Sequence, residues 1–470
     1  MLGSVAETET LSAAGRLEAL CDPGSLEVIR SEVTSVQMGE KARAGDGVVG
    51  GSGLVDGRPV FCYAQDSSYL GGSLGEAHAN TIVRVLELAE RARAPVVGFA
   101  GSGGARMQEG VNALGGYARI FRQTVKLSGR VPQISVISGL SAGGGAYSPA
   151  LTDWVVMTAS SSMFLTGPAV VREALGEVVT AEQLGGSGVH SRNGVAHFQA
   201  ATDAAAALLV RELLSFLPSH RQLPPPVSEA LPAGAADPAA HVPRSSRAVY
   251  DVRSVISAIA DGAELLEVSA RWARNLCTAL IRIEGRPVGV IANQPRYLGG
   301  VLDVASSEKG ARFVNQCEAF GLPILVLVDT PGFMPGSRQE AAGVIRHGAA
   351  FVRAFAAATV PRVTVILRKA FGGAFITMNS KDLGADYVFA WPQAEIGVMG
   401  ALPAVGIISR RELQAAEDPA AARQELAQRY AQQHLRPQAA AATGHVDELI
   451  EPARTRERVA KALRSLEHAR

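Results

Sequence analysis

The sequence lacks an excess of charge of either sign. Its 470 residues carry 45 Lys and Arg against 44 Asp and Glu, so no basic surface for nucleic acid or an anionic membrane is expected. It also lacks any uninterrupted run of the ~18 to 20 apolar residues that a membrane span requires. Acidic residues stand near the N-terminus, where a secretory signal would be basic, so a cytoplasmic location is predicted.

Cysteine is scarce, with only Cys21, Cys62, Cys277 and Cys317. Their spacing gives no CxxC pair that could hold zinc or run a redox cycle, so no metal site is predicted. We interpret the four as scattered, reduced thiols of the core. The remaining composition, with 47% apolar residues and 50 glycines, predicts an α/β protein long enough for two or three domains.

The chain does contain two similar halves. A segment that begins at Val131 and ends in glycines 143–145 has a counterpart that begins at Val360, 229 positions later, and ends in glycines 372 and 373. Gly103 matches Gly332 at the same offset of 229, and residues 56–60 and 71–74 match 284–288 and 299–302 at an offset of 228. Chance similarity does not keep register over so long a stretch, so we infer an internal duplication.

The duplication predicts two domains of one fold. We expect an N-terminal domain over residues 1–220, a Pro/Ala-rich linker over 221–247, and a C-terminal domain over 248–470, because prolines exclude regular structure between the halves. Strands are expected at 133–138 and 362–367, and helices at 112–125 and 341–358. Charged surface helices are expected at 419–434 and 454–470. Alternating strands and helices indicate stacked ββα or βαβ units.

In each half a buried strand leads directly into glycines, at Gly143–Gly145 and at Gly372–Ala374, and a helix follows. Glycines allow consecutive N–H groups to point outward at a helix N-terminus, which is how an oxyanion hole is built. A turn that only packs is the alternative. The cluster Gly101–Arg106 also ends a strand, and it could bind a phosphate or a thioester or merely pack, but it lacks the Lys-Ser/Thr ending of a P-loop.

Residues Gly139–Gly143 match the Gly-x-Ser-x-Gly elbow of α/β-hydrolases. The position that matches Ser141 in the second half is Ala370, so the duplicated turn keeps its glycines and loses the hydroxyl. What both copies share is backbone geometry. A hydrolase with Ser141 as nucleophile is therefore disfavoured.

Eight motifs, in order along almost the whole chain, resemble the signatures of acyl-CoA carboxylase β subunits: Ser102–Gly110, Val131–Val136, Ala146–Asp153, Gly194–His197, Ala292–Pro295, Ser307–Lys309, Val328–Phe333 and Arg368–Ala374. The resemblance implies an α/β protein of two tandem crotonase-like (ClpP/crotonase) domains. It also implies a homohexamer, a dimer of trimers, with active sites between the N-domain of one subunit and the C-domain of another. Because the chain carries neither a Met-Lys-Met biotin site nor an ATP-binding domain, a separate biotinylated α subunit is expected.

The same resemblance implies the reaction and its residues. In this family carboxybiotin delivers CO2 to the enolate of an acyl-CoA, so two anionic oxygens must be stabilised. Gly143 and Gly144 would hold the thioester oxygen, and Gly373 and Ala374 the ureido oxygen of biotin. The neighbouring positions would bind substrate: Gly103, Gly104, Ala105, Gly145, Ala146, Tyr147, Gly372, Phe375 and Ile376. Since biotin supplies the base, no acid/base pair of the protein and no bound metal is expected.

The expectation about the acyl group depends on Ile376. Propionyl-specific relatives carry an acidic residue there and relatives that accept acetyl-CoA an apolar one, so Ile376 favours acetyl-CoA, with propionyl-CoA as a second substrate; ordinary helix packing is the alternative. Residues Gly336–Gly343 depart from the family pattern on the biotin side. Two other functions stay open: a biotin-linked malonyl- or methylmalonyl-CoA decarboxylase or transcarboxylase subunit, and an inactive scaffold of the hexamer.

Overall fold

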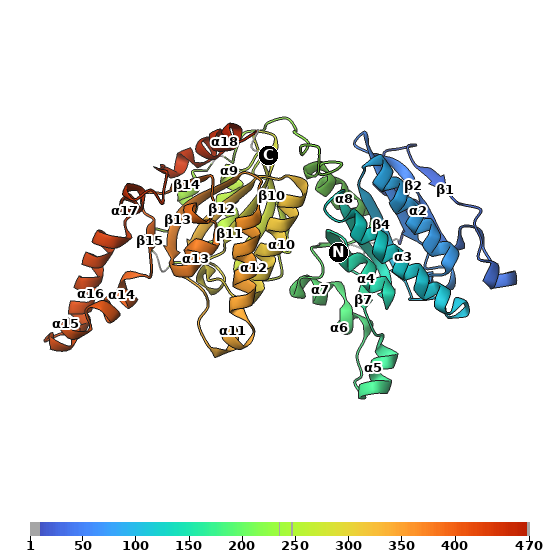
Figure 1. Cartoon of the computed structure of the whole chain (residues 1–470), viewed down its shortest axis with the longest axis horizontal. Coiled ribbons are helices and arrows are strands. Elements are labelled where there is room, and N and C mark those ends of the chain that lie inside the picture. The colour runs from blue at the N-terminus through green and yellow to red at the C-terminus, as the bar shows by residue number, and fades with distance from the viewer. Residues whose placement is uncertain (1–9, 235, 246–247, 468–470) are drawn as a thin grey trace, which may run out of the picture. The chain divides into compact units, whose positions relative to one another are not determined.

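A computed structural model describes residues 10–234, 236–245 and 248–467 (Figure 1). The chain divides into two compact units, Met1–Pro226 and Val227–Arg470. Each unit is built on an eight-stranded sheet, and the two sheets have the same order of strands. The predicted duplication of a mixed α/β fold is therefore confirmed.

The first unit has a largely parallel sheet. Its strands are β1 (Glu27–Ile29), β2 (Val48–Val55), β3 (Arg58–Gln65), β4 (Val96–Ser102), β5 (Gln133–Ala142), β6 (Trp154–Thr158), β7 (Ser162–Phe164) and β8 (Phe198–Ala200). The order is β1-β2-β3-β4-β5-β6-β8, antiparallel as far as β3 and parallel beyond it, while β7 pairs with the end of β5. Every residue of β4 is buried, as expected for a parallel strand that is covered on both faces.

Helices connect and cover these strands: α1 (Ala13–Leu20), α2 (Glu76–Ala92), α3 (Val111–Leu127), α4 (Gly144–Ala150), α5 (Pro168–Leu175), α6 (Ala181–Gly185), α7 (Ser187–Asn193) and α8 (Asp203–Phe216). The crossover helices α2 and α3 lie side by side along the sheet (Figure 1). Helices α1 and α8 pack against each other and on strands β3, β5 and β6. The predicted strand at 133–138 and helix at 112–125 are confirmed as β5 and α3.

The second unit repeats this plan. Its strands are β9 (Leu266–Val268), β10 (Leu276–Ile283), β11 (Arg286–Asn293), β12 (Ile324–Thr330), β13 (Arg362–Phe371), β14 (Tyr387–Ala390), β15 (Glu395–Gly397) and β16 (Glu448–Leu449). Strand β12 is entirely buried, like β4, and β15 pairs with the end of β13, as β7 does with β5. In both units the pairing of the two central strands is interrupted by a bulge, between Ala100 and Ser102 and between Val328 and Thr330.

The helices of the second unit are α9 (Val252–Ile259), α10 (Val304–Phe320), α11 (Ser337–Ala341), α12 (Val344–Ala357), α13 (Gly372–Thr377), α14 (Ala401–Ile408), α15 (Arg410–Ala415), α16 (Pro419–Tyr430), α17 (Pro437–Ala442) and α18 (Thr455–Ser465). Helix α10 begins with a capping box between Asp303 and Ser306 and ends at Gly321, whose φ of 66° suits glycine. The helix predicted at 341–358 is α12, and α11 precedes it as a separate short helix.

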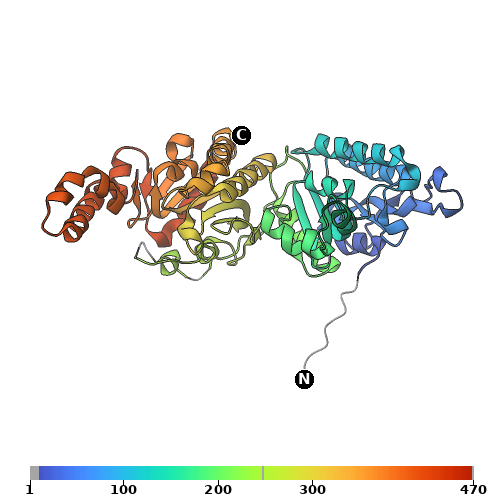
Figure 2. The same ribbon diagram turned by 90° about the horizontal axis from the view of Figure 1, so that it is seen from below.

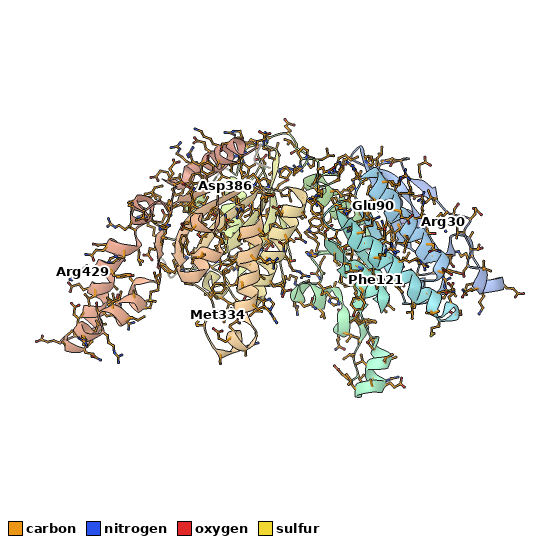
Figure 3. The ribbon with its side chains drawn as sticks, in the orientation of Figure 1. Arg30, Glu90, Phe121, Met334, Asp386 and Arg429 are labelled. Carbon is orange, nitrogen blue, oxygen red and sulfur yellow. The ribbon has the colours of Figure 1, made fainter. Side chains whose placement is uncertain are left out.

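The two units differ most in the segments that follow β7 in the first unit and β15 in the second. The first inserts α5, α6 and α7 there, and the second inserts α14 to α17. Helices α14, α15 and α16 lie together at one end of the second unit in both views (Figures 1 and 2), and Figure 3 marks Arg429 on α16. The surface helix predicted at 419–434 is α16 followed by a π-helical turn, Ala431–Leu435. The helix predicted at 454–470 is α18, but it is not only a surface helix, because Val459 and Leu463 pack in the core.

From Val227 onward the chain packs on the second unit. The N–H of Ser228 donates to the carbonyl of Gly285. Val242 belongs to the main core cluster of this unit. The Arg368 guanidinium donates to the carbonyl of Ser245 at 2.7 Å. These contacts hold much of the proline-rich segment on the second unit.

Backbone hydrogen bonds correct one detail of the predicted duplication. The N–H of Leu74 donates to the carbonyl of Gly104, and the N–H of Leu302 donates to the carbonyl of Gly332. Gly104 therefore matches Gly332 at an offset of 228, whereas the sequence comparison had set Gly103 against it. The extra residue of the second half lies farther along, before Val360. Ala105 consequently corresponds to Phe333.

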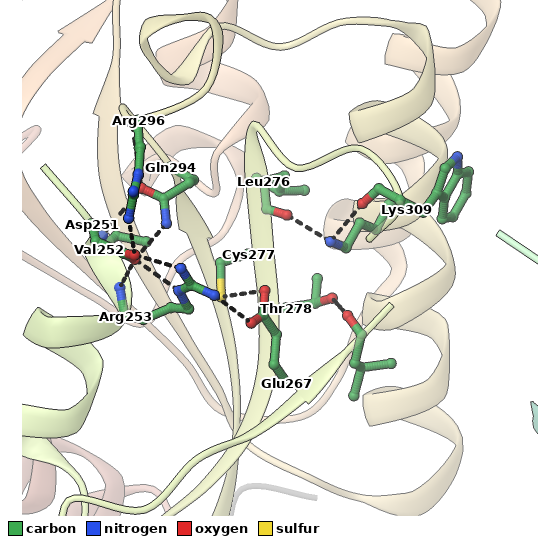
Figure 4. A network of polar contacts seen from close by, with 12 residues as sticks. Asp251, Val252, Arg253, Glu267, Leu276, Cys277, Thr278, Gln294, Arg296 and Lys309 are labelled. Atoms are coloured by element: carbon green, nitrogen blue, oxygen red, sulfur yellow. Dashed lines mark hydrogen bonds and ion pairs between the residues drawn. The ribbon is translucent and has the colours of Figure 1, made fainter. Parts of the chain in front are cut away.

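Several residues of the signature motifs support the second unit. Lys309 is buried, and its ammonium donates to the carbonyls of Trp272 and Leu276 at 3.0 and 2.7 Å (Figure 4). Burial lowers the pKa of Lys309 to about 8. Gln294 donates to the Asp251 carboxylate at 2.7 Å and so connects β11 with the start of α9 (Figure 4). We therefore assign Lys309 and Gln294 structural roles.

Asp153 provides a test of how burial affects stability. Its carboxylate accepts the N–H of Gln133 at 2.8 Å, and burial raises its pKa to about 7. Between pH 4 and pH 7 the Asp153 carboxyl is therefore protonated in the folded state and ionised in the unfolded chain. The free energy of unfolding is highest below pH 4 as far as Asp153 is concerned, and it falls as the pH rises through about 7. We expect Asp153→Asn, which keeps an acceptor oxygen, to flatten that pH dependence and to raise the melting temperature above pH 7.

The duplicated position supplies the control for this experiment. Asp386, marked in Figure 3, accepts the N–H of Arg362 at 2.7 Å in the same way, but it also attracts the Arg362 guanidinium. Asp386→Asn should therefore lower the melting temperature. Melting curves of both variants from pH 4 to 8 test the pair, and a parallel response of the two would contradict the argument.

Candidate active site

The first glycine turn joins β5 to α4. Gly143 has φ 58° and ψ −125°, a backbone conformation that residues other than glycine rarely adopt. Its N–H donates to the carbonyl of Phe164 on β7 at 3.1 Å. The predicted oxyanion contact from the Gly143 amide is therefore not available in this structure, because that hydrogen is already used within the fold.

The next two glycines face Tyr117 on α3. A β-carbon at Gly144 would lie 2.7 to 2.9 Å from atoms of the Tyr117 ring, so only glycine fits there. The N–H of Gly145 faces the Tyr117 hydroxyl. Burial raises the pKa of this hydroxyl, and its hydrogen bonds with Ser102 and Gly145 partly oppose that effect. Gly144 is the first residue of α4, where an N–H has no partner within the helix. Gly144 is thus the amide of this turn best placed to bind an anionic oxygen.

A second amide points toward the same turn. Leu74 bonds to the carbonyl of Gly104 and to the N–H of Arg106, which flank Ala105. Successive amides of an extended segment point to opposite edges, so the N–H of Ala105 points away from Leu74, toward the β5 side. The two segments are adjacent there, since a β-carbon at Gly104 would lie 3.6 Å from the carbonyl oxygen of Ala142. Ala105 and Gly144 together can form a two-donor hole.

The second glycine turn, between β13 and α13, has the same geometry. Gly372 has φ 60°, close to the value of its counterpart Gly143. Gly373 is exposed at the beginning of the helix, whereas Ala374 is fully buried. The nearest atom to a β-carbon at Gly373 is 3.8 Å away, on the ring of Phe333. Because Phe333 occupies the position of Ala105, its N–H points to this turn by the same argument.

A cavity of about 660 Å³ opens beside the second turn. Gly372, Gly373, Phe375 and Ile376 line one side of it, and Ile376 is 50% exposed. Ile396 and Val398 extend the apolar wall, and the edge is polar: Asp382, Gln433, His434, Thr443 and His445. An Asp382–His445 contact of 2.8 Å closes this edge. This cavity can hold an apolar group next to the Gly373 amide.

In the predicted substrate-binding cluster Gly103–Ala105, two of the three backbone N–H groups already donate hydrogen bonds within the protein. The N–H of Gly103 donates to the carbonyl of Gly71, and that of Gly104 to the Ser102 hydroxyl at 3.2 Å. These two amides are therefore unable to cradle a phosphate in this conformation. Ala105 is the member of the cluster that keeps an outward amide.

Buried charges hold the loop after β4 in place. The Arg106 guanidinium contacts Asp46 at 2.6 Å and Glu109 at 2.8 Å, and all three side chains are buried. It also donates to the carbonyl of Ser73 at 3.0 Å. Glu109 in turn accepts the N–H of Glu76 at the start of α2. This network fixes the backbone around Ala105.

The hydroxyl of Ser141, the nucleophile of the disfavoured hydrolase, donates to the carbonyl of Gly145 at 3.0 Å. Ser141 is fully buried and stabilises the glycine turn from inside. The predicted preference against a hydrolase agrees with this geometry. Among the described residues there is also no group of three His, Cys, Asp or Glu side chains that could hold a metal ion.

The remaining predicted residues lie near one turn or the other. Ala146 is buried in α4, and Tyr147 is exposed and packs edge-on against Phe121 of α3, which Figure 3 marks. Tyr117 and Phe333 were missed, because nothing in the sequence sets these two aromatic residues apart from ordinary packing. An alignment of the halves at the offset of 228 would have identified Phe333 as the partner of Ala105.

Comparisons with known proteins identify the family. Residues 7–470 match the family described as "Carboxyl transferase domain". The chain is 46% identical to the methylmalonyl-CoA carboxyltransferase 12S subunit of Propionibacterium freudenreichii subsp. shermanii, over 96% of this chain and 88% of that one. It is 48% identical to the propionyl-CoA carboxylase beta chain of Saccharopolyspora erythraea, over 97% and 87%.

Solved structures agree with these relatives. A crystal structure of transcarboxylase 12S, a hexamer with methylmalonyl-coenzyme A and methylmalonic acid bound, superposes with a TM-score of 0.94 at 45% identity and covers 98% of this chain and 90% of that one. A single-chain, multi-domain long-chain acyl-CoA carboxylase gives 0.84 at 31% identity, over 96% of this chain and 46% of that one. The fold is therefore that of the predicted tandem crotonase-like domains. The chain belongs to the carboxyl transferase family, as a carboxyltransferase β subunit of the acyl-CoA carboxylases.

Proposed function

We propose that this protein carboxylates a short acyl-CoA, with acetyl-CoA as the preferred substrate and malonyl-CoA as product, and that it also accepts propionyl-CoA. The observation that carries the mechanism is the repeated turn, in which Gly143 and Gly372 have nearly the same φ and each precedes an outward amide. Two like-built sites suit a reaction in which two oxygens become anionic.

The first hole would hold the thioester oxygen. The N–H groups of Gly144 and Ala105 would stabilise the negative charge that forms on this oxygen when the α-carbon loses its proton, and Tyr117 would keep the turn in shape. Preorganised donors of this kind lose little energy to reorganisation during the reaction. This assignment replaces the pair Gly143 and Gly144 that the sequence suggested.

The second hole would hold the ureido oxygen of biotin, through the N–H groups of Gly373 and Phe333. The apolar wall formed by Phe375 and Ile376 suits a ring system with an apolar side chain. When bound, carboxybiotin supplies the carboxyl group and the base, and the residues of this chain orient it and exclude water. We propose that a separate biotinylated α subunit brings this group to a homohexamer of the chain, a dimer of trimers.

The acyl preference can be tested at Ile376, which is half exposed in the cavity wall. An acidic residue there is expected to shift the ratio of kcat/KM for acetyl-CoA and propionyl-CoA toward propionyl-CoA by about tenfold, the effect of one methylene group in an apolar site. The measurement compares wild type, Ile376→Asp and Leu208→Asp, which changes an exposed side chain of α8. Unchanged ratios in Ile376→Asp would reduce Ile376 to a packing residue.

The alternative function runs the same chemistry from a malonyl- or methylmalonyl-type donor, as a decarboxylase or transcarboxylase subunit. The 46% identity to a methylmalonyl-CoA carboxyltransferase 12S subunit supports this alternative function. Assays with a biotinylated biotin carboxylase distinguish the two. Acyl-dependent consumption of ATP and bicarbonate supports carboxylation, whereas CO2 release or carboxyl transfer from methylmalonyl-CoA without ATP supports the alternative. If the assembled complex turned over no substrate in either assay, the chain would be an inactive scaffold of the hexamer.

A further inference from the structure

Two of the four cysteines, Cys21 and Cys62, lie against each other although they are distant in sequence. Cys21 directly follows α1, and Cys62 lies in β3. Both thiols are free and buried, and a hydrogen bond connects them. The expectation of scattered thiols was thus wrong for this pair, because the packing of α1 on the β2–β3 hairpin brings them together.

The backbone holds Cys21 firmly over this hairpin. The N–H of Cys21 donates to the carbonyl of Leu17 at 3.0 Å, and the next N–H, of Asp22, donates to the carbonyl of Leu54 on β2 at 2.7 Å. A β-carbon at Gly53 would lie 2.6 Å from the Cys21 sulfur, so the missing side chain makes room for the thiol. Gly51 pairs with Cys62, and Gly53 lies two residues along on the same face. The Cys21 sulfur therefore lies on the face that Cys62 occupies.

The two thiols are not equivalent. The hydrogen bond from Cys62 lowers the pKa of the Cys21 thiol, whereas burial and the Asp22 carboxylate oppose this effect and the Arg211 guanidinium adds to it. The pKa of Cys62 is raised well above the ordinary value, because it donates that bond and is buried. Cys21 is 5% exposed and Cys62 is 0% exposed. Cys21 is thus the more accessible of the two residues, and its position at the end of α1, outside the sheet, makes it the one that a peroxide reaches first.

We propose that Cys21 and Cys62 are a redox-active pair that forms a reversible disulfide on reaction with a hydroperoxide. The Cys21 thiolate attacks the terminal oxygen of the hydroperoxide, and the O–O bond breaks to give a sulfenic acid. The leaving group is hydroxide from hydrogen peroxide or an alkoxide from an alkyl hydroperoxide, and it takes up a proton to give water or an alcohol. The Cys62 thiol then attacks the Cys21 sulfur; the S–O bond breaks, water leaves with the proton of Cys62, and the S–S bond forms. Two electrons pass from the thiols to the peroxide, and a dithiol reductant restores the pair.

The other two cysteines serve as internal controls. Cys277 and Cys317 are buried, and burial raises the pKa of both thiols. Cys277 contacts the Glu267 carboxylate, which disfavours its thiolate further (Figure 4). Neither is expected to react with peroxide in the folded protein. Neither Cys21 nor Cys62 belongs to a glycine turn, so the proposal does not depend on the proposed function.

The test treats the folded full-length chain with hydrogen peroxide, removes the peroxide, blocks remaining thiols with N-ethylmaleimide under denaturing conditions, and maps the peptides by mass spectrometry. We expect a cross-linked peptide containing residues 21 and 62, lighter than the two reduced peptides by about 2 Da, with Cys277 and Cys317 alkylated. Dithiothreitol added to the oxidised protein before the N-ethylmaleimide step should return all four thiols. Cys62→Ser should instead trap a sulfenic acid at Cys21, detected with dimedone, and Cys277→Ser should behave as wild type.

Two results would overturn the proposal. One is complete alkylation of Cys21 and Cys62 after peroxide treatment. The other is oxidation of Cys21 in the wild type to a sulfenic or sulfinic acid while Cys62 stays alkylated. Both are read on the wild-type chain, so the outcome does not depend on whether Cys62→Ser folds.

Discussion

Replacing Gly373 by proline should lower kcat for carboxyl transfer on the order of 10² to 10³-fold, because proline removes one hydrogen-bond donor to an anionic oxygen. Gly373 is the second residue of α13 and lies in the first turn, where an N–H has no intrahelical partner and proline is tolerated. Space is available, since a β-carbon at Gly373 meets nothing closer than 3.8 Å. The change therefore removes one hydrogen-bond donor, and its β-carbon does not collide with a neighbouring segment.

Gly373→Ala is the matched control, because alanine adds the same β-carbon but keeps the N–H. It should stay within a few-fold of wild type in kcat. Both variants are compared by steady-state kinetics with the biotinylated partner and by melting temperature. Equal activity of the proline and alanine variants would remove Gly373 from the catalytic set. Gly144 does not offer this test, because a side chain there collides with Tyr117 and would confound folding with catalysis.

Replacing Arg106 by methionine should destabilise the first unit by about 3 to 5 kcal/mol, the cost of leaving buried charges without their partner. Asp46 and Glu109 would remain buried beside each other without the guanidinium. Burial already raises the pKa of Asp46 even with Arg106 present. Urea midpoints and melting temperatures measure the effect. Because the loop that carries Ala105 depends on this network, the KM for acyl-CoA should also rise.

Arg84→Met is the control for Arg106, since Arg84 forms an exposed pair with Glu87 at 3.3 Å. Such a pair contributes less than about 1 kcal/mol. Adding Asp46→Asn to Arg106→Met should recover part of the loss by removing one of the two stranded carboxylates. Similar destabilisation by the Arg84 and Arg106 variants would show that the buried network is not a special support of the loop.

Most of the fold could be predicted from the sequence because its signals are local or repeated. Alternating apolar runs and alanine-rich segments predicted the strands and helices around residue 133 and residue 362. The recurrence of the same motifs about 228 residues apart predicted two copies of one domain. The insertions α5–α7 and α14–α17 were predicted only in part, because the duplication has no counterpart for them.

The chemistry of the site was predictable only to the level of the glycine turns. Gly143 and Gly144 look alike in the sequence, yet the first N–H donates to Phe164 and the second does not have a partner within its helix. The role that we propose for Ala105 and Phe333 follows from their bridges to Leu74 and Leu302, which leave the Ala105 and Phe333 amides on the opposite edge. Whether an N–H of the turn is free to bind substrate depends on whether another segment of the chain places a hydrogen-bond acceptor, such as the Phe164 carbonyl, next to it.

The sequence by itself determined the duplicated α/β fold, the family and the two glycine turns, since glycine adopts without steric cost the positive φ that the backbone takes at Gly143 and Gly372. Only the tertiary structure decided which amides remain outward, which aromatic ring holds each turn, and which cysteines meet. The physical reason is that a hydrogen bond or a thiol pair depends on distances of a few ångströms between segments far apart in the chain.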